Sequence, residues 1–330
     1  MDWIKKIIET YGKEYIYHFN TSGYLFTEEN LKFLSQYNSQ FTLSIDGGEM
    51  LTNYLRPVKG NRSHTGYFKK IKEIVPVLQY YFPNTIAKLI INNRYVDLLY
   101  ENYLELERVG FRKVSLILDF NSRPSYATHP TTRPIIQRLW NDEDTKILQE
   151  QMSLITKEIL IGFSMNIRRM EITNFNNIVE FLLKQQKDYS PDNLVCNLFE
   201  GRTLETMTNS KDRTCFSGLY DNLDDAKKAL IEEFNSCNGK CPHDEDCPAF
   251  LYCANYNCPI SSYHATKSFL KADELECIMA KASYFSAVAL LQNANDICPD
   301  SLAYKQYLNQ FNYKGKEEYL NGISNTLLPL

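Results

Sequence analysis

The segment Phe41-Thr42-Leu43-Ser44-Ile45-Asp46-Gly47-Gly48 decides the fold class of this chain. A short β-type run that stops at small and polar residues is typical of a strand followed by a turn. Three other segments have the same form, and each is flanked by a helical pattern: Tyr15 to Phe19, Thr85 to Ile91 and Val114 to Asp119. The sequence therefore predicts four strands in the first half of the chain.

Helical patterns separate these predicted strands. They cover Met1 to Gly12, Glu28 to Tyr37, Gly66 to Tyr81, and Val96 to Val109 with Gly110 as the stop signal. Strands that alternate with helices are typical of βαβ units around a parallel sheet, so we expect an α/β fold. Residues 120–140 contain three prolines and are expected to form a long loop before a helix from Asp142 to Ile159.

Length and composition indicate an ordinary globular protein. With 330 residues, 44% of them hydrophobic, the chain can bury a full core, and we expect one large domain and a smaller one. The formal net charge is -4 and no basic stripe with interleaved aromatic residues occurs, so no nucleic-acid partner is expected. Met1 to Ile8 has amphipathic helical spacing without a long apolar run, so we expect no secretory signal, no membrane association and a cytoplasmic location.

Beyond about residue 190 the composition shifts to cysteine, aspartate and asparagine, apart from helical patterns at Asp224 to Phe234 and from Leu275 onward. Five of the nine cysteines form the run Cys241-x5-Cys247-x5-Cys253-x4-Cys258-x18-Cys277. The odd count and the length of the chain disfavour a disulfide scaffold. Thiolates hold iron-sulfur clusters and zinc, but zinc sites usually contain Cys-x2-Cys, which is absent here. The spacing therefore favours iron-sulfur, and buried inert thiols remain an alternative for Cys237 and Cys298.

The predicted strand ends resemble those of radical S-adenosylmethionine (radical SAM) enzymes. The segment from Phe19 to Thr27 resembles their Thr-Asn-Gly-x-Leu-Leu-Thr turn after the third strand. Leu43 to Gly48, followed by Arg56-Pro57, resembles their Ser-Ile-Asp-Gly strand end with its downstream arginine, although Thr52-Asn53 departs from the usual His-Asp. The cysteine region is similar to the SPASM extension of this family, which carries two auxiliary 4Fe-4S clusters.

This resemblance assigns roles to individual residues. It implies S-adenosylmethionine contacts at Thr21, Ser44, Asp46 and Arg56, and each of these could instead be an ordinary loop anchor. It implies that one auxiliary cluster is held by four thiols and the other by three with an unresolved fourth ligand. The first set is Cys241, Cys247, Cys253 and Cys277, and the second is Cys196, Cys215 and Cys258. Cys237 could replace a missing ligand, and Cys298 has no counterpart.

One element of the family pattern is absent from this sequence. Radical SAM chemistry needs a cluster bound by Cys-x3-Cys-x2-Cys near the first strand, and no such motif occurs. In the resemblance, Met1 falls in the helix before the family's third strand. We therefore expect a partial (β/α) radical SAM-type barrel that lacks its first two βα units at 1–165. A SPASM-like domain at 166–285 and a C-terminal helical cap at 286–330 are expected to follow.

The resemblance implies a maturase that modifies a ribosomally made peptide and that is inactive alone, because the catalytic cluster motif is absent. S-adenosylmethionine is expected only if the missing N-terminal part is supplied, for example by a separate chain that completes the barrel. The alternative is a non-catalytic iron-sulfur or zinc-binding remnant, or a subunit of a split enzyme. The sequence leaves open whether the chain is a gene fragment, a degenerate homologue or half of such an enzyme.

Overall fold

The computed structural model describes residues 6, 16–57, 66–119, 139–183, 223–256 and 259–311. Its centre is a five-stranded parallel sheet in which the spatial order of the strands is their order in the chain. The strands are β1 (Tyr17–Thr21), β2 (Ser39–Ser44), β3 (Ile86–Ile91), β4 (Lys113–Leu118) and β5 (Glu171–Ile172). The predicted α/β fold with a parallel sheet is confirmed, and the first four strands correspond to the four predicted ones.

The helices that follow the strands begin and end at recognisable sequence signals. The Thr27 side chain accepts a hydrogen bond from the Asn30 amide at the start of α2, and Asn141 and Asp144 form a capping box on α6. The helices before the cysteine region are α2 (Glu28–Leu34), α3 (Glu49–Leu55), α4 (Tyr67–Tyr81), the 3₁₀ turn η1 (Val96–Leu98), α5 (Leu99–Val109), α6 (Asp142–Ser164) and α7 (Thr173–Leu183).

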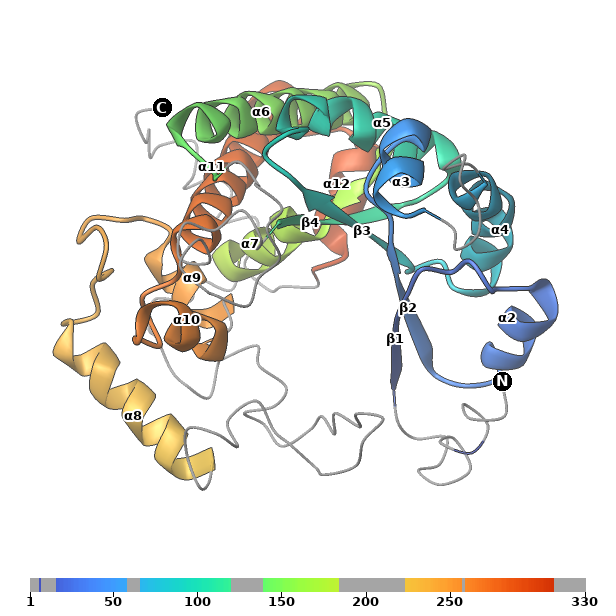
Figure 1. Ribbon diagram of the computed structural model, residues 1–330. Helices are drawn as coiled ribbons and strands as arrows, with labels where there is room; N and C mark the ends of the chain where they lie inside the picture. The colour runs from blue at the N-terminus through green and yellow to red at the C-terminus, as the bar shows by residue number, and fades with distance from the viewer. Residues whose placement is uncertain are drawn as a thin grey trace.

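Helices α2 to α6 form an arc around the outer side of the sheet (Figure 1). Burial alternates along the inner strands: in β3, Ala87, Leu89 and Ile91 are buried, whereas the residues between them are half-buried. This period of two places the apolar side chains against the arc of helices. The half-buried set, which includes Lys88, therefore points to the opposite, less covered face of the sheet.

Three elements of this half of the molecule were not predicted: β5, α3 and α7. The strand β5 has two residues, too few to show a period, yet it pairs with the start of β4 through Lys113 opposite Glu171. It extends the sheet beyond residue 165, and α7 packs against β4 directly after it. The domain boundaries at 165 and 285 stay predictions. The first predicted helix and the loop at 120–138 lie outside the described residues, apart from Lys6.

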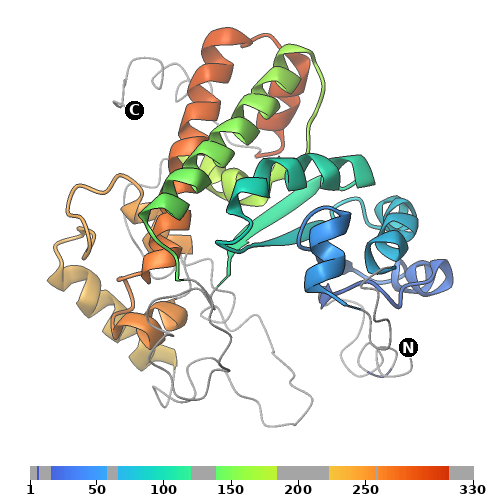
Figure 2. The ribbon, with the colours of Figure 1, turned by 45° about the horizontal axis from the view of Figure 1, so that its top comes forward.

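The second half of the chain is helical where it is described. Its helices are α8 (Leu223–Ser236), α9 (Phe250–Tyr256), α10 (Pro259–Thr266), α11 (Glu274–Ile297) and α12 (Leu302–Asn309). The long helix α11 runs beside α6 (Figure 2) and also packs on α7, so it shares the main core with the sheet. By contrast, α8 to α10 stand apart from the sheet (Figure 1). No helix among the described residues is long and apolar enough to cross a membrane.

A small second core lies beneath α8 to α10. Its buried members are Leu230, Phe250, Ala254, Phe269 and Leu270. The carboxylate of Glu233 on α8 accepts hydrogen bonds from the amides of Phe269, at 2.9 Å, and Leu270, at 3.1 Å. This carboxylate therefore fastens α8 to the loop after α10, and it compensates for the small apolar area buried there.

Candidate functional site

The carboxyl ends of β1 and β2 meet at one edge of the parallel sheet, where ligands bind in this class of fold. The Tyr67 hydroxyl on α4 lies 2.7 Å from the carbonyl oxygen of Ser22 and 3.0 Å from that of Ser44. Burial raises the pKa of Tyr67, so this hydroxyl stays protonated and can donate to either carbonyl. The Thr21 side chain accepts a hydrogen bond from the Gly23 amide and so anchors the turn after β1.

Two residues predicted to contact S-adenosylmethionine bind each other. The Arg56 guanidinium lies 2.5 Å from Asp46 Oδ2 through Nε, and it donates to Asp46 Oδ1 at 3.0 Å through a terminal nitrogen. The Asp46 side chain is only 5% exposed and that of Arg56 is 28% exposed. Helix α3 lies between these two residues in the sequence, and it places Arg56 next to the end of β2. The resulting two-point pair neutralises a buried carboxylate.

The Gly47-Gly48 turn fits closely against α5. Gly47 has a φ of +130°, and a Cβ atom there would lie 2.3 Å from the side chain of Asn102. The side-chain oxygen Oδ1 of Asn102 accepts a hydrogen bond from the Gly48 amide at 2.7 Å. Only glycine provides both this backbone conformation and this close approach. The turn is therefore fixed in place by α5, and it in turn fixes the position of Asp46.

A hollow opens beside this turn, at the carboxyl ends of β2 and β3. Its polar lining is formed by Asp46, Asn92, Tyr95 and Asn102, and apolar side chains of α3, β3 and α5 complete it. Asn92 donates a hydrogen bond to Asp119 Oδ2 at 2.8 Å, which links the ends of β3 and β4. The ends of β2, β3 and β4 thus form a polar edge, and the hollow itself has room for about one water molecule.

Lys88 is a candidate site residue that the sequence reasoning missed. In the strand register it lies between Ser44 of β2 and Ser115 of β4, so the three side chains form a row on the less covered face. Lys88 is half-buried and makes no hydrogen bond or ion pair with a described residue. A half-buried lysine inside a strand that has no hydrogen-bond or ion-pair partner among the described residues is unusual. The signal in the sequence was a lysine inside the otherwise apolar strand Ile86-Ala87-Lys88-Leu89-Ile90-Ile91.

The cysteine region brings together Cys241, Cys247, Cys253 and Cys277, which we call the four-cysteine group. They come from the loop after α8, from α9 and from the first turn of α11. Burial raises the pKa of Cys247, Cys253 and Cys277, and other thiols of the group raise it further. Every pair of the four is close enough for this effect. The structure therefore gathers the same four thiols that the resemblance assigned to one cluster.

The four-cysteine group offers thiols, which are the ligand type of both zinc sites and iron-sulfur clusters. None of the four is in a disulfide. Within the described part of the chain, no three Cys, His, Asp or Glu side chains are close enough to hold a single metal ion. Zinc requires its ligand sulfurs about 2.3 Å from one centre. A 4Fe-4S cluster instead spreads four thiolates around a larger inorganic core.

The remaining cysteines divide into three kinds. Cys237 ends α8 with its thiol directed at the carbonyl oxygens of Glu233 and Phe234, and it is close enough to Cys241 for that thiol to raise its pKa. Cys298 caps the far end of α11, roughly 30 Å along the helix from the four-cysteine group. The predicted ligands of the second cluster, Cys196, Cys215 and Cys258, lie outside the described residues.

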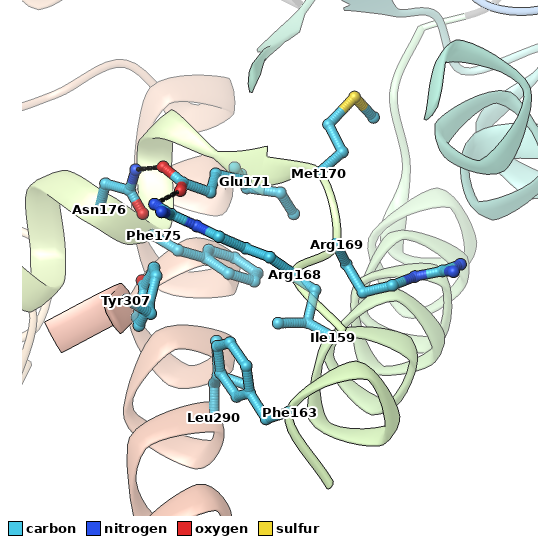
Figure 3. A pocket seen from close by; sticks show the side chains of 11 residues that line it. Ile159, Phe163, Arg168, Arg169, Met170, Glu171, Phe175, Asn176, Leu290 and Tyr307 are labelled. Atoms are coloured by element: carbon cyan, nitrogen blue, oxygen red, sulfur yellow. Dashed lines mark hydrogen bonds and ion pairs between the residues drawn. The ribbon is translucent and has the colours of Figure 1, made fainter. Parts of the chain in front are cut away.

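A separate small cavity lies at the opposite end of the sheet, near the start of β5 (Figure 3). Glu171 binds Arg168 on one oxygen and accepts a hydrogen bond from Asn176 at 2.9 Å on the other. The Tyr307 hydroxyl is buried beside them without a hydrogen-bond partner among the described residues, and burial raises its pKa. Arg168 is thus paired with Glu171 within the cavity, and Arg169 is paired with Glu107 and Glu158 beside it, so the cavity belongs to the packing of α6, α7, α11 and α12.

Comparison with known proteins identifies the fold. No family model matches the chain, and no curated protein matches it in sequence. A solved structure of native anSMEcpe with bound AdoMet (S-adenosylmethionine) and Kp18Cys peptide is similar, with 16% identity and a TM-score of 0.55 over 94% of this chain and 81% of that chain. Histidine-tagged anSMEcpe with bound AdoMet gives 15% identity and a TM-score of 0.56 over 97% and 80%. Since anSMEcpe is a radical SAM/SPASM enzyme, the predicted resemblance is confirmed at the level of the fold.

Proposed function

We propose that this chain is an iron-sulfur protein of the radical SAM/SPASM peptide-maturase type, with a ribosomally made peptide as its substrate. The observation that supports the proposal is the four-cysteine group: the four thiols that the resemblance implies as ligands of one cluster lie near one another. The similar structures of anSMEcpe contain AdoMet and a peptide, which supports these two ligand classes here. The proposed chemistry needs reduced thiols and therefore a reducing compartment such as the cytoplasm.

In this proposal the four-cysteine group holds one auxiliary 4Fe-4S cluster, which supplies an electron-transfer or substrate-binding centre when bound. The protein supplies four thiolates from three separate segments, so cluster binding fastens the loop after α8, α9 and α11 together. Cys277 lies in the first turn of α11, where the helix dipole favours the thiolate form that a cluster requires. Cys196, Cys215 and Cys258 are the proposed ligands of the second auxiliary cluster.

The proposed site for S-adenosylmethionine is the polar edge at the ends of β1 to β4. Thr21, Ser44 and Asp46 lie there, and the half-buried ammonium group of Lys88 adds a cation that can bind a carboxylate. For Arg56 to bind the cofactor carboxylate it must share its guanidinium with Asp46. The terminal nitrogens of the planar guanidinium leave further N–H donors for this purpose.

We propose that catalysis needs protein beyond this chain, because its sequence contains no Cys-x3-Cys-x2-Cys to hold the catalytic cluster. Among the described residues, β1 pairs with β2 on one side only, so its other edge can accept a strand. In this proposal the chain is a partial barrel, and a separate chain supplies the missing strands and the cluster.

A second candidate is a non-catalytic iron-sulfur-binding subunit or remnant. The Asp46–Arg56 pair favours it, because the two predicted cofactor contacts already neutralise each other. The two candidates differ in whether the polar edge binds S-adenosylmethionine. Isothermal titration of the reconstituted chain with this cofactor tests the polar edge: binding that weakens in Lys88→Gln supports the first candidate, whereas no binding shows that this chain alone does not hold the cofactor.

Metal analysis tests the proposal as a whole. The chain reconstituted with iron and sulfide under anaerobic conditions should hold about eight irons as two clusters and show a brown absorbance. Incubated with S-adenosylmethionine and dithionite, it should release no 5'-deoxyadenosine. Stoichiometric zinc without iron would overturn the assignment of the cysteine region, and turnover by the isolated chain would overturn the predicted need for a partner.

A further inference from the structure

Lys281 lies beside the four-cysteine group and is not one of its proposed ligands. It follows Cys277 by one helical turn on α11, and residues four apart lie on the same helix face. Its ammonium group lies close enough to Cys247 and Cys277 to oppose the burial that raises the pKa of both thiols. This lysine thus faces the thiols from two different segments.

The same ammonium group connects α11 to the loop that carries two of the thiols. Lys281 Nζ lies 3.0 Å from Asp244 Oδ2, and their side chains are 34% and 46% exposed. The backbone carbonyl of Asp244 accepts a hydrogen bond from the Cys247 amide at 3.0 Å. Asp244 is therefore part of the turn that positions Cys247, and Lys281 holds this turn against the start of α11.

We propose that Lys281 is the charge partner of the auxiliary cluster held by the four-cysteine group and raises the reduction potential of that cluster. The inference rests on the proposed function, since it requires the cluster. A 4Fe-4S cluster with four thiolate ligands carries net negative charge, and one-electron reduction adds a further negative charge. A nearby cation stabilises the reduced state more than the oxidised state, and net charge near a cluster is a known determinant of its potential.

Substitution of Asp244 distinguishes an electrostatic role of Lys281 from a purely structural one. If Lys281 acts by charge, Lys281→Met removes a positive charge and lowers the potential, whereas Asp244→Asn removes a negative charge and raises it. If the ion pair acts only as a tether, both substitutions break the same contact. They would then reduce iron content equally and leave the potential of the remaining clusters unchanged.

The experiment is a redox titration of reconstituted protein with dithionite, followed by absorbance and electron paramagnetic resonance, with iron counted in each sample. The variants are Lys281→Met, Lys281→Arg and Asp244→Asn. Lys305→Met is the matched control, because Lys305 pairs with Asp300 at 2.9 Å just beyond the opposite end of α11. We expect a negative shift of one cluster's potential in Lys281→Met, a positive shift in Asp244→Asn, and the original potential in Lys281→Arg and Lys305→Met.

Each outcome bears on a different claim. Potentials unchanged in both Lys281→Met and Asp244→Asn, or shifted in the same direction, would overturn the charge role of Lys281 and leave the proposed function standing. Absence of iron from the unaltered chain would overturn the proposed function and this inference with it. Should Lys281→Met bind too little iron for titration, Lys281→Gln and the Asp244→Asn result decide the sign.

Discussion

The sheet region (residues 16–183) and the cysteine region (residues 223–277) differ in how their charged and reactive side chains are paired. In the sheet region the buried carboxylate of Asp46 is neutralised by Arg56, and Asn92 binds Asp119. In the cysteine region, the thiols of the four-cysteine group lie close enough for several of them to raise one another's pKa. The buried charge at the end of β2 is therefore neutralised within the sheet region, whereas under the proposed function the thiols of the cysteine region are complemented by a bound cluster.

The hydrophobic cores of the two regions also differ, in the number of residues that they bury. The core of the sheet region extends from α2 to α12 and includes fully buried aromatic side chains such as Tyr103, Phe111 and Phe175. The core beneath α8 to α10 has five buried members. A core this small contributes little stability, and small domains of this kind commonly depend on metal ligation. The two cores meet at α9, since Tyr252 belongs to the main core and Phe250 and Ala254 belong to the small one. Because most of the main core lies outside the cysteine region, we predict that loss of cysteine ligands leaves the sheet region folded.

The largest effect is expected from Cys253→Ser. The serine hydroxyl is a poor ligand for iron, so one cluster should be lost, which is about four irons per chain. Iron analysis after reconstitution measures this loss, and circular dichroism should show that the helices and the sheet remain. Cys298→Ser is the control, because Cys298 caps the remote end of α11. Equal iron loss in both variants would contradict the assignment of the four-cysteine group.

Arg56→Met should damage only the sheet region. It leaves the buried Asp46 carboxylate without its counter-charge, which costs roughly 2–4 kcal/mol of unfolding free energy. Urea denaturation at neutral pH measures the difference, and iron content should not change. Arg108→Met is the matched control, because Arg108 pairs with Glu105 at 3.2 Å on the exposed surface of α5 and should cost under about 0.5 kcal/mol. Equal losses would show that the Asp46–Arg56 pair is not buried in solution.

Gly47→Ala tests whether the turn at the end of β2 is as closely packed as the structure indicates. The alanine Cβ would strike Asn102 in a backbone conformation with φ of +130°, so we expect a loss of about 1–3 kcal/mol. Gly48→Ala is the neighbouring control, because its φ is ordinary and its Cβ would lie 3.3 Å from Glu105 Cγ, a much milder contact. Chemical denaturation that ranks Gly48→Ala as the more harmful would contradict the close packing of this turn against α5.

The smallest effect is expected when the hydroxyl group is removed from either of two buried tyrosines of the main core. The Tyr103 hydroxyl donates a hydrogen bond to the Met170 carbonyl at 2.6 Å, so Tyr103→Phe should cost about 1 kcal/mol. The Tyr307 hydroxyl has no such partner among the described residues, so Tyr307→Phe should be neutral or stabilising. Thermal unfolding of both variants measures the contrast. A larger loss in Tyr307→Phe would indicate that its hydroxyl binds an ordered water molecule in the small cavity.

Local patterns predicted most of the sheet region. The alternation along Phe41 to Ile45 and the stop at Gly110 reappear as β2 and as the end of α5, where Gly110 has a φ of +108°. The strand β5 escaped prediction because its two residues gain their conformation from pairing with β4. Helix α3 escaped because Gly47 and Gly48, which precede it, are typical of a turn. Most boundaries moved by one to three residues, and the end of α6 moved from Ile159 to Ser164, since the last hydrogen bonds of an element depend on its neighbours.

The sequence by itself determined which residue types carry the chemistry: the cysteine spacing, the Asp-Gly-Gly strand end and the absence of Cys-x3-Cys-x2-Cys. These are local or countable properties of the chain. Only the tertiary structure decided which of those residues lie next to one another in space. It paired Asp46 with Arg56, placed Lys88 between Ser44 and Ser115, and set Lys281 against thiols from another segment. Contacts between distant segments arise from strand register and helix packing, and no local pattern encodes them.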